Sequence, residues 1–76
     1  MPGRLPQLKP KELIRVLEKL GFVFRRQIGS HCILRHPETG KVTSVPMHSG
    51  DIKRGLLFGI IKQAGLSQEE FLRLLQ

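Results

Sequence analysis

The chain has 76 residues and one cysteine, and 13 Lys and Arg against 6 Asp and Glu give it a net charge of +7 at pH 7. This length predicts one small domain, and a single cysteine excludes an internal disulfide, which favours a reducing compartment. No apolar run approaches the ~20 residues that span a bilayer, and the N-terminus lacks the apolar core of a signal peptide. We therefore expect a soluble, cytoplasmic protein with no membrane partner.

The basic excess is concentrated in the middle of the chain. Residues 19–62 contain eight basic and two acidic side chains, which is nearly the whole surplus. A surplus concentrated in this way is typical of proteins that bind phosphates. It favours nucleic acid as the partner over an acidic protein or a membrane surface, although charge alone does not decide between them.

The first predicted element is a helix over residues 10–20. Residues 1–8 contain two prolines and no apolar period, so we expect an extended arm followed by a single domain over 9–76. Pro10 suits the first position of a helix, and the apolar residues from Leu13 to Leu20 form one helical stripe. Gly21 ends the helix, with Phe22 folding back on Leu17.

Three short strands follow, and two helices complete the predicted fold. Strands are expected at 22–28, 31–35 and 41–45, separated by Gly29-Ser30 and by the turn at 37–40, which predicts an antiparallel meander. A second helix carries the apolar residues from Leu56 to Ala64 and ends at Gly65. A capping box at 67–70 begins a short third helix.

The order α-β-β-β-α-α predicts a two-layer α+β domain. We expect the helices to cover one face of the sheet and to leave the other face open. Gly55 and Gly59 are four residues apart in the second helix, and we interpret them as a site of tight packing on the sheet. Cys32 and Met47 are interpreted as packing residues.

The sequence excludes several classes of enzyme. It has no P-loop, no HExxH, no CxxC pair and no G-x-S-x-G. Carboxylates are scarce, which disfavours a paired-carboxylate mechanism and a two-metal nuclease. Adjacent residues of a strand point to opposite faces, so His31 and Cys32 do not form a chelating pair. We expect no metal site and no cofactor.

Histidine acting alone remains as a source of chemistry. RNA supplies its own nucleophile, the 2′-hydroxyl, so cleavage requires only proton transfer and charge stabilisation. His31 follows Gly29 and Ser30, whose small size would allow a phosphate backbone to approach, although a solvent-facing strand residue has the same pattern. His36 is expected to be structural. His48 is equally compatible with a second proton-transfer group and with an ordinary loop residue.

Lys53 and Arg54 lie at the start of the second predicted helix. Their charges, together with the exposed N–H groups of the helix end, form a potential phosphate-binding site. Two solvated surface charges would give the same pattern.

Six short segments, in order and at matching spacing, resemble the HicA toxin family. They are Leu20-Gly21-Phe22, Gly29-Ser30-His31, His36-Pro37, Gly40-Lys41, Val45-Pro46-Met47-His48-Ser49-Gly50, and Ile52-Lys53-Arg54-Gly55 leading to Ile61-Lys62-Gln63-Ala64-Gly65-Leu66. The resemblance extends from about Leu8 to the end of the chain.

This resemblance implies a fold similar to a double-stranded-RNA-binding domain, in agreement with the predicted order of elements. It also implies a toxin of a type II toxin–antitoxin pair that cleaves mRNA without the ribosome and is silenced by a HicB-type antitoxin. Together with the scarcity of carboxylates, the resemblance predicts a metal-independent endoribonuclease with single-stranded mRNA as its substrate. His31 matches the histidine of the family's G-x-H motif, and Gly29 matches its glycine. Cys32 stands where many relatives have a second histidine, and Leu56 where relatives often have threonine.

Two other functions stay open at this point. A catalytically silent RNA-binding module of the same fold would bind RNA in a salt-dependent manner without cleaving it. A basic adaptor that binds an acidic protein would show no special affinity for RNA.

Overall fold

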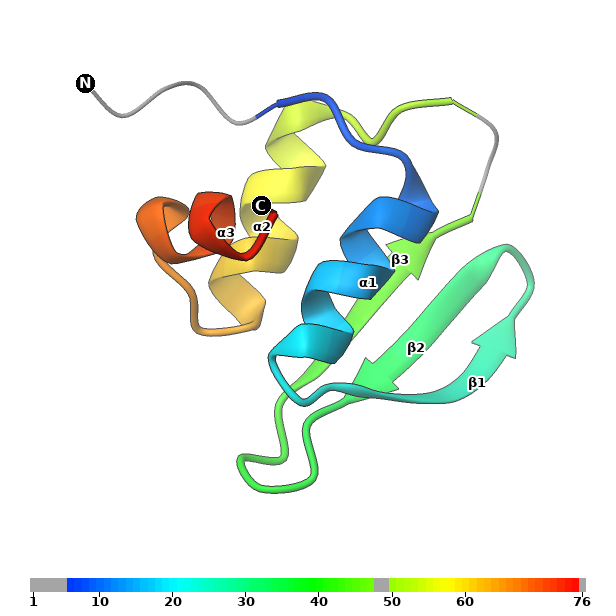
Figure 1. The fold of residues 1–76 in the computed structure, drawn as a ribbon. Helices are drawn as coiled ribbons and strands as arrows, with labels where there is room; N and C mark the ends of the chain where they lie inside the picture. Colours follow the sequence, from blue (N-terminus) through cyan, green and yellow to red (C-terminus); the bar gives the residue numbers. More distant parts are fainter. Residues whose placement is uncertain (1–5, 48–49, 76) are drawn as a thin grey trace.

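A computed structural model describes residues 6–47 and 50–75 of the chain. The predicted order of elements is confirmed, with boundaries that differ by one residue in α1, β1 and β3 (Figure 1). The elements are α1 (Pro10–Lys19), β1 (Val23–Ile28), β2 (His31–Arg35), β3 (Val42–Pro46), α2 (Arg54–Gln63) and α3 (Gln68–Leu75).

The three strands form the predicted antiparallel meander in the order β1-β2-β3. Ile28 pairs with His31 across the two-residue turn Gly29-Ser30. Gly29 has a φ of 58°, and positive φ at the first central residue alone fits the type II′ turn, whose twist matches that of the flanking strands. The register of β1 shifts at a bulge between Phe24 and Arg26.

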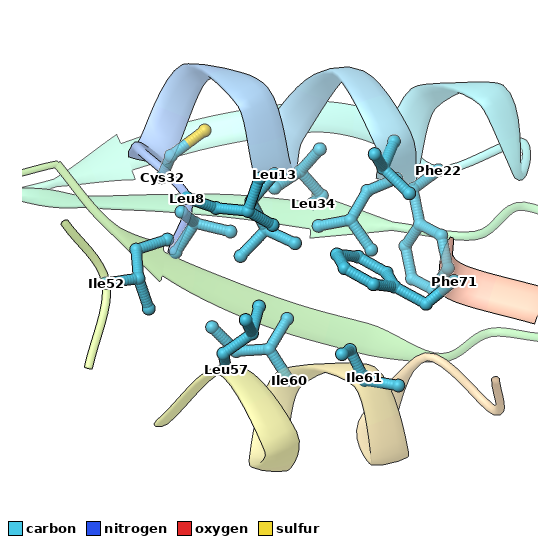
Figure 2. Close-up of a cluster of buried hydrophobic side chains, with 13 residues drawn as sticks. Leu8, Leu13, Phe22, Cys32, Leu34, Ile52, Leu57, Ile60, Ile61 and Phe71 are labelled. Carbon is cyan, nitrogen blue, oxygen red and sulfur yellow. The ribbon is translucent and has the colours of Figure 1, made fainter. Parts of the chain in front are cut away.

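The helices cover one face of the sheet, and the hydrophobic core fills the space between the two layers. Figure 2 shows side chains of α1 and α2 meeting those of the sheet. Leu34 and Val45 are fully buried, and Cys32 is 4% exposed. β1 is not covered, since all six of its residues are exposed (Figure 1). The predicted two-layer arrangement with one open sheet face is confirmed.

Both long helices end in the same glycine cap. After α1, Phe22 N–H donates to Leu17 C=O at 3.0 Å and Gly21 N–H donates to Glu18 C=O at 3.0 Å. This pair of bonds defines the Schellman motif, which satisfies carbonyls that the helix leaves unpaired. The bonds from Leu66 and Gly65 to the last turn of α2 repeat the motif. The predicted helix ends are therefore confirmed.

His36 joins the end of α1 to the turn between β2 and β3. Its Nε2 lies 3.1 Å from Leu20 C=O, and its Nδ1 lies 3.2 Å from Glu38 N–H and 3.3 Å from Thr39 N–H. The neutral tautomer with hydrogen on Nε2 satisfies all three contacts. The ring also packs edge-on against Phe22, with centroids 5.3 Å apart. This histidine is structural, as the sequence indicates.

The capping box of α3 is also present. Ser67 N–H donates to the Glu70 carboxylate at 3.0 Å, and Glu70 N–H donates to Ser67 Oγ at 3.1 Å. These hydrogen bonds lower the pKa of Glu70. A lowered folded-state pKa stabilises the fold above the ordinary glutamate value, and this contribution is lost as the pH falls through the lowered pKa.

Leu8 belongs to the core although the sequence assigns it to the extended arm. It is 3% exposed, and its carbonyl accepts a 2.7 Å hydrogen bond from Ile52 N–H. Residues 6–9 have no helix or strand but run alongside the segment that leads into α2. The apolar side chain and this backbone bond attach the arm's last residue to the domain.

The predicted packing of Gly55 and Gly59 on the sheet is wrong. Both residues are exposed, and a Cβ built on either would meet nothing within 4 Å. The residues of α2 that face the core are Leu57, Ile60 and Ile61. Helical spacing places the two glycines on the opposite side of the helix. Each costs about 1 kcal/mol relative to alanine, and no contact within the described chain offsets this cost.

Two Gly→Ala substitutions should therefore change stability in opposite directions. Gly21 has a φ of 105°, and a Cβ there would lie 2.9 Å from His36 Nε2, so Gly21→Ala should destabilise the fold by about 1–3 kcal/mol. Gly59→Ala should stabilise it by up to about 1 kcal/mol because the site is open and helical. Urea unfolding monitored by circular dichroism measures both, and a shift in the same direction would contradict the different surroundings of the two glycines.

Burial should also make the Cys32 thiol unreactive in the native protein. Desolvation raises its pKa, and the nearby charge of Glu18 raises it further, so little reactive thiolate forms at neutral pH. Iodoacetamide should label Cys32 far more slowly in buffer than in urea. A Val42→Cys variant in a Cys32→Ala background provides an exposed control, and its thiol should react at similar rates in buffer and in urea. Rapid native labelling of Cys32 would refute its burial.

Candidate functional site

His31 is the first residue of β2 and is exposed on the open face of the sheet. Cys32 and Leu34 point into the core, and side chains alternate along a strand, so His31, Ile33 and Arg35 point away from the helices. The same alternation that buries Leu34 therefore presents the histidine to solvent.

Ser44 of β3 contacts the imidazole of His31. Its Oγ lies 3.4 Å from Nδ1. In the antiparallel register His31 pairs with Pro46 and Ile33 pairs with Ser44, which makes Ser44 the diagonal neighbour of the histidine on the same face. The contact connects the ring to β3. The residue pattern alone did not identify Ser44 as a neighbour of His31. Only the register of β2 and β3 places the two residues side by side.

Arg26 is the diagonal neighbour of His31 on the other side. It pairs with Ile33 while Ile28 pairs with His31, so its side chain shares the open face. Arg35 lies further along that face and pairs with Val42. In the sequence both arginines belong to the basic surplus, without an indicated role. The bulge in β1 decides on which face Arg26 lies, and the residue pattern did not reveal it.

Apolar side chains surround these cations. Val23, Ile28 and Val42 are 51%, 57% and 51% exposed, and their pairing partners place them on the same face as His31. We call the set His31, Ser44, Arg26, Arg35, Val23, Ile28, Ile33 and Val42 the open-face site. It combines a titratable ring, two guanidinium groups and an apolar surface.

Gly29 and Ser30 form the turn that leads into His31. Ser30 C=O accepts a 2.6 Å hydrogen bond from Met47 N–H, which joins this turn to the segment after β3. Gly29 is required by the turn itself, because L side chains are strained at its positive φ. His48 directly follows Met47 in the sequence but lies outside the described residues.

Lys53 and Arg54 lie in the helix layer, away from the open face. Lys53 is the N-cap of α2 and Arg54 its first residue, and both are exposed. The first turn of α2 contains no acidic residue, so its N–H groups and these cations form a positive end. A hollow lined in part by Pro46 and Lys53 lies between the end of β3 and the start of α2. Pro46, one of its lining residues, is the strand partner of His31.

The described residues contain no group of three or more His, Cys, Asp or Glu placed to hold a metal ion. Cys32 is in the core and His36 is held by backbone groups, so neither side chain is available as a ligand. In the same part of the chain, no helix has the length and apolar character to cross a membrane.

Comparison with known proteins identifies the family. No curated protein matches the chain. The family model described as the HicA toxin of bacterial toxin–antitoxin systems matches residues 10–66, which include every strand and helices α1 and α2. The match covers most of the 76 residues and spans the open-face site. The chain belongs to the HicA toxin family, and as such is a toxin of a toxin–antitoxin system with an antitoxin partner.

Proposed function

We propose that this toxin is a metal-independent endoribonuclease that cleaves single-stranded mRNA at the open-face site. The observation that supports this most strongly is the exposed imidazole of His31, with Ser44 at 3.4 Å and Arg26 diagonal to it on one sheet face. Histidine is the side chain best suited to proton transfer near neutral pH. The basic charge of the chain favours a phosphate-containing substrate.

The reaction uses the nucleophile that RNA already contains. The 2′-oxygen attacks the adjacent phosphorus and loses its proton, while the bond from phosphorus to the 5′-oxygen breaks and that oxygen gains a proton. His31 exchanges a proton with these reacting oxygens. The products are a 2′,3′-cyclic phosphate and a 5′-hydroxyl end. Ser44 acts as a positioning residue that holds the ring through Nδ1.

Cations stabilise the charge that develops on the phosphate. Arg26 is suited to this role because its guanidinium shares the open face with His31 and presents a planar fork of donors. Lys53 and Arg54, at the positive end of α2, hold a neighbouring phosphate of the same RNA. Gly29 and Ser30 let the RNA backbone approach the turn, and His48 is an optional assistant.

The antitoxin is of the HicB type and covers the open-face site. The histidine is surrounded by an apolar surface, formed by Val23, Ile28 and Val42. Binding of RNA phosphates does not require such a surface. An antitoxin segment that packs on this surface and carries acidic groups toward the arginines would exclude RNA. A toxin–antitoxin complex that still cleaves RNA would contradict this placement.

Replacing His31 should abolish cleavage without unfolding the protein. In His31→Ala with EDTA present, the cleavage rate of a mixed mRNA should fall by about 10²–10⁴-fold, since the proton-transfer group is lost. The unfolding midpoint should change little because the side chain is exposed. Cleavage is measured with the wild type in parallel, and the product ends are analysed for cyclic phosphate.

The other outcomes of this experiment identify the alternatives. Equal cleavage by both proteins would exclude His31 as the catalytic residue. Salt-dependent RNA binding without cleavage by the wild type would indicate the silent binding module. Weak binding of any polyanion would indicate the basic adaptor.

Three charge substitutions should separate catalysis from binding. Arg26→Gln should lower the cleavage rate by about tenfold or more, because it removes a donor beside the reacting phosphate. Lys53→Gln should weaken RNA binding and reduce the slope of log K against log salt by about 0.7. Arg15→Gln, which removes the same charge from the exposed face of α1, is the control and should change neither strongly. Equal effects at all three positions would indicate net charge alone.

A further inference from the structure

The side of α2 that faces away from the core combines two glycines with two large apolar side chains. Gly55 and Gly59 lie opposite the buried residues of the helix, and Lys62 follows them at helical spacing. Leu56 and Phe58 flank this line and are 44% and 41% exposed. We call these five residues the α2 outer face.

The α2 outer face has the shape of a shallow trough. On one flank, Phe58, Gly59 and Lys62 line a groove together with Leu66, from the connection to α3. On the other flank, Leu56 lines the hollow at the end of β3. Between the flanks, nothing lies within 4 Å of a Cβ built on either glycine. Another backbone can therefore approach the helix closely between two apolar ridges.

Within the described chain, no contact accounts for this arrangement. Glycine inside a helix is unfavourable relative to alanine, and the exposed phenyl and isobutyl groups remain in contact with water. Both costs are offset when a partner covers the trough. We propose that the α2 outer face is a docking surface for a helix of the antitoxin that carries apolar residues into the trough and an acidic residue toward Lys62.

Charge favours the antitoxin over a second copy of the chain. The chain carries +7, and α2 contains no acidic residue while Lys53 caps its start and Lys62 lies in its last turn. Two α2 outer faces packed together would bring cations against cations. The acid nearest in sequence is Asp51, which lines the hollow at the start of α2 together with the cation Lys53. Glu69 and Glu70 follow α2, and the carboxylate of Glu70 accepts a hydrogen bond from Ser67 N–H. An acidic partner of the basic toxin is complementary to this face.

The position of this surface gives it a distinct role. The α2 outer face points away from the sheet, on the helix side of the molecule. His31 lies on the sheet face that the helices do not cover, so a helix docked on α2 leaves His31 uncovered. It would anchor the antitoxin while another part of it covers the open-face site. This inference rests on the proposed function, because the HicB type of the antitoxin is part of that proposal.

Three substitutions on the α2 outer face test the proposal. Purified HicB-type antitoxin of the same pair is titrated calorimetrically against wild type, Gly59→Gln, Phe58→Ser and Gly59→Ala. The Kd should rise about tenfold or more for the first two variants, as expected for residues at the centre of an interface. Lys11→Gln, on the exposed face of α1, is the control and should bind as the wild type does.

Gly59→Ala separates a binding effect from misfolding. It should raise the unfolding temperature by up to about 8 °C, because alanine favours the helix and the site is open. It should nevertheless weaken antitoxin binding, a combination that a misfolded variant cannot produce. All three variants should cleave RNA as fast as the wild type in the absence of antitoxin.

Each remaining outcome identifies which of the two proposals is wrong. The docking surface is rejected, and the proposed function kept, if Gly59→Gln and Phe58→Ser bind the antitoxin with unchanged Kd while the wild type cleaves RNA and the antitoxin inhibits that cleavage. A wild type that does not cleave RNA rejects the proposed function instead, and one that does not bind the antitoxin rejects the docking surface. A wild-type dimer in sedimentation equilibrium that Gly59→Gln converts to monomer would identify a second copy as the occupant.

Discussion

The burial of alternate residues in β2 is the constraint on which the rest of this structure depends. Leu34 is fully buried and Cys32 nearly so, and both contribute to the core between the sheet and the helices. A register slip of one residue would bury His31 and expose Leu34, at the cost of a core side chain and of desolvating the imidazole. The packing energy of these two buried side chains therefore decides on which face the catalytic candidate beside them lies.

A second constraint holds the two layers together at the other end of the sheet. His36 bonds to Leu20 at the end of α1 and to the turn after β2, and the absence of a side chain at Gly21 makes room for its ring. The Thr43 hydroxyl donates to Gln63 at 3.0 Å and ties β3 to α2 in a similar way. These few polar contacts, added to a small core, position the open-face site without placing any of its residues in the core.

The molecule thus presents two surfaces with different chemistry. The open face of the sheet carries a histidine, arginines and β-branched residues, which suits both a phosphate backbone and a protein that replaces it. The α2 outer face carries glycines and apolar residues with cations nearby, which suits a protein helix. A toxin that must be active alone and silent in a complex benefits from this division, because affinity for the antitoxin can be increased on α2 without changing the groups around His31.

The sequence by itself determined the order of elements and the helix ends, and it singled out His31 as the candidate residue. Those features depend on local properties: apolar period, glycine at positive φ, proline at a helix start and the G-x-H motif. The sequence did not reveal Ser44 and Arg26 beside His31, because their placement depends on strand register and on a bulge. It assigned Gly55 and Gly59 to the wrong side of α2, because glycine spacing does not indicate which side of a helix meets the core. Only the tertiary structure decided these points, since packing of Leu57, Ile60 and Ile61 against the sheet sets the rotation of the helix.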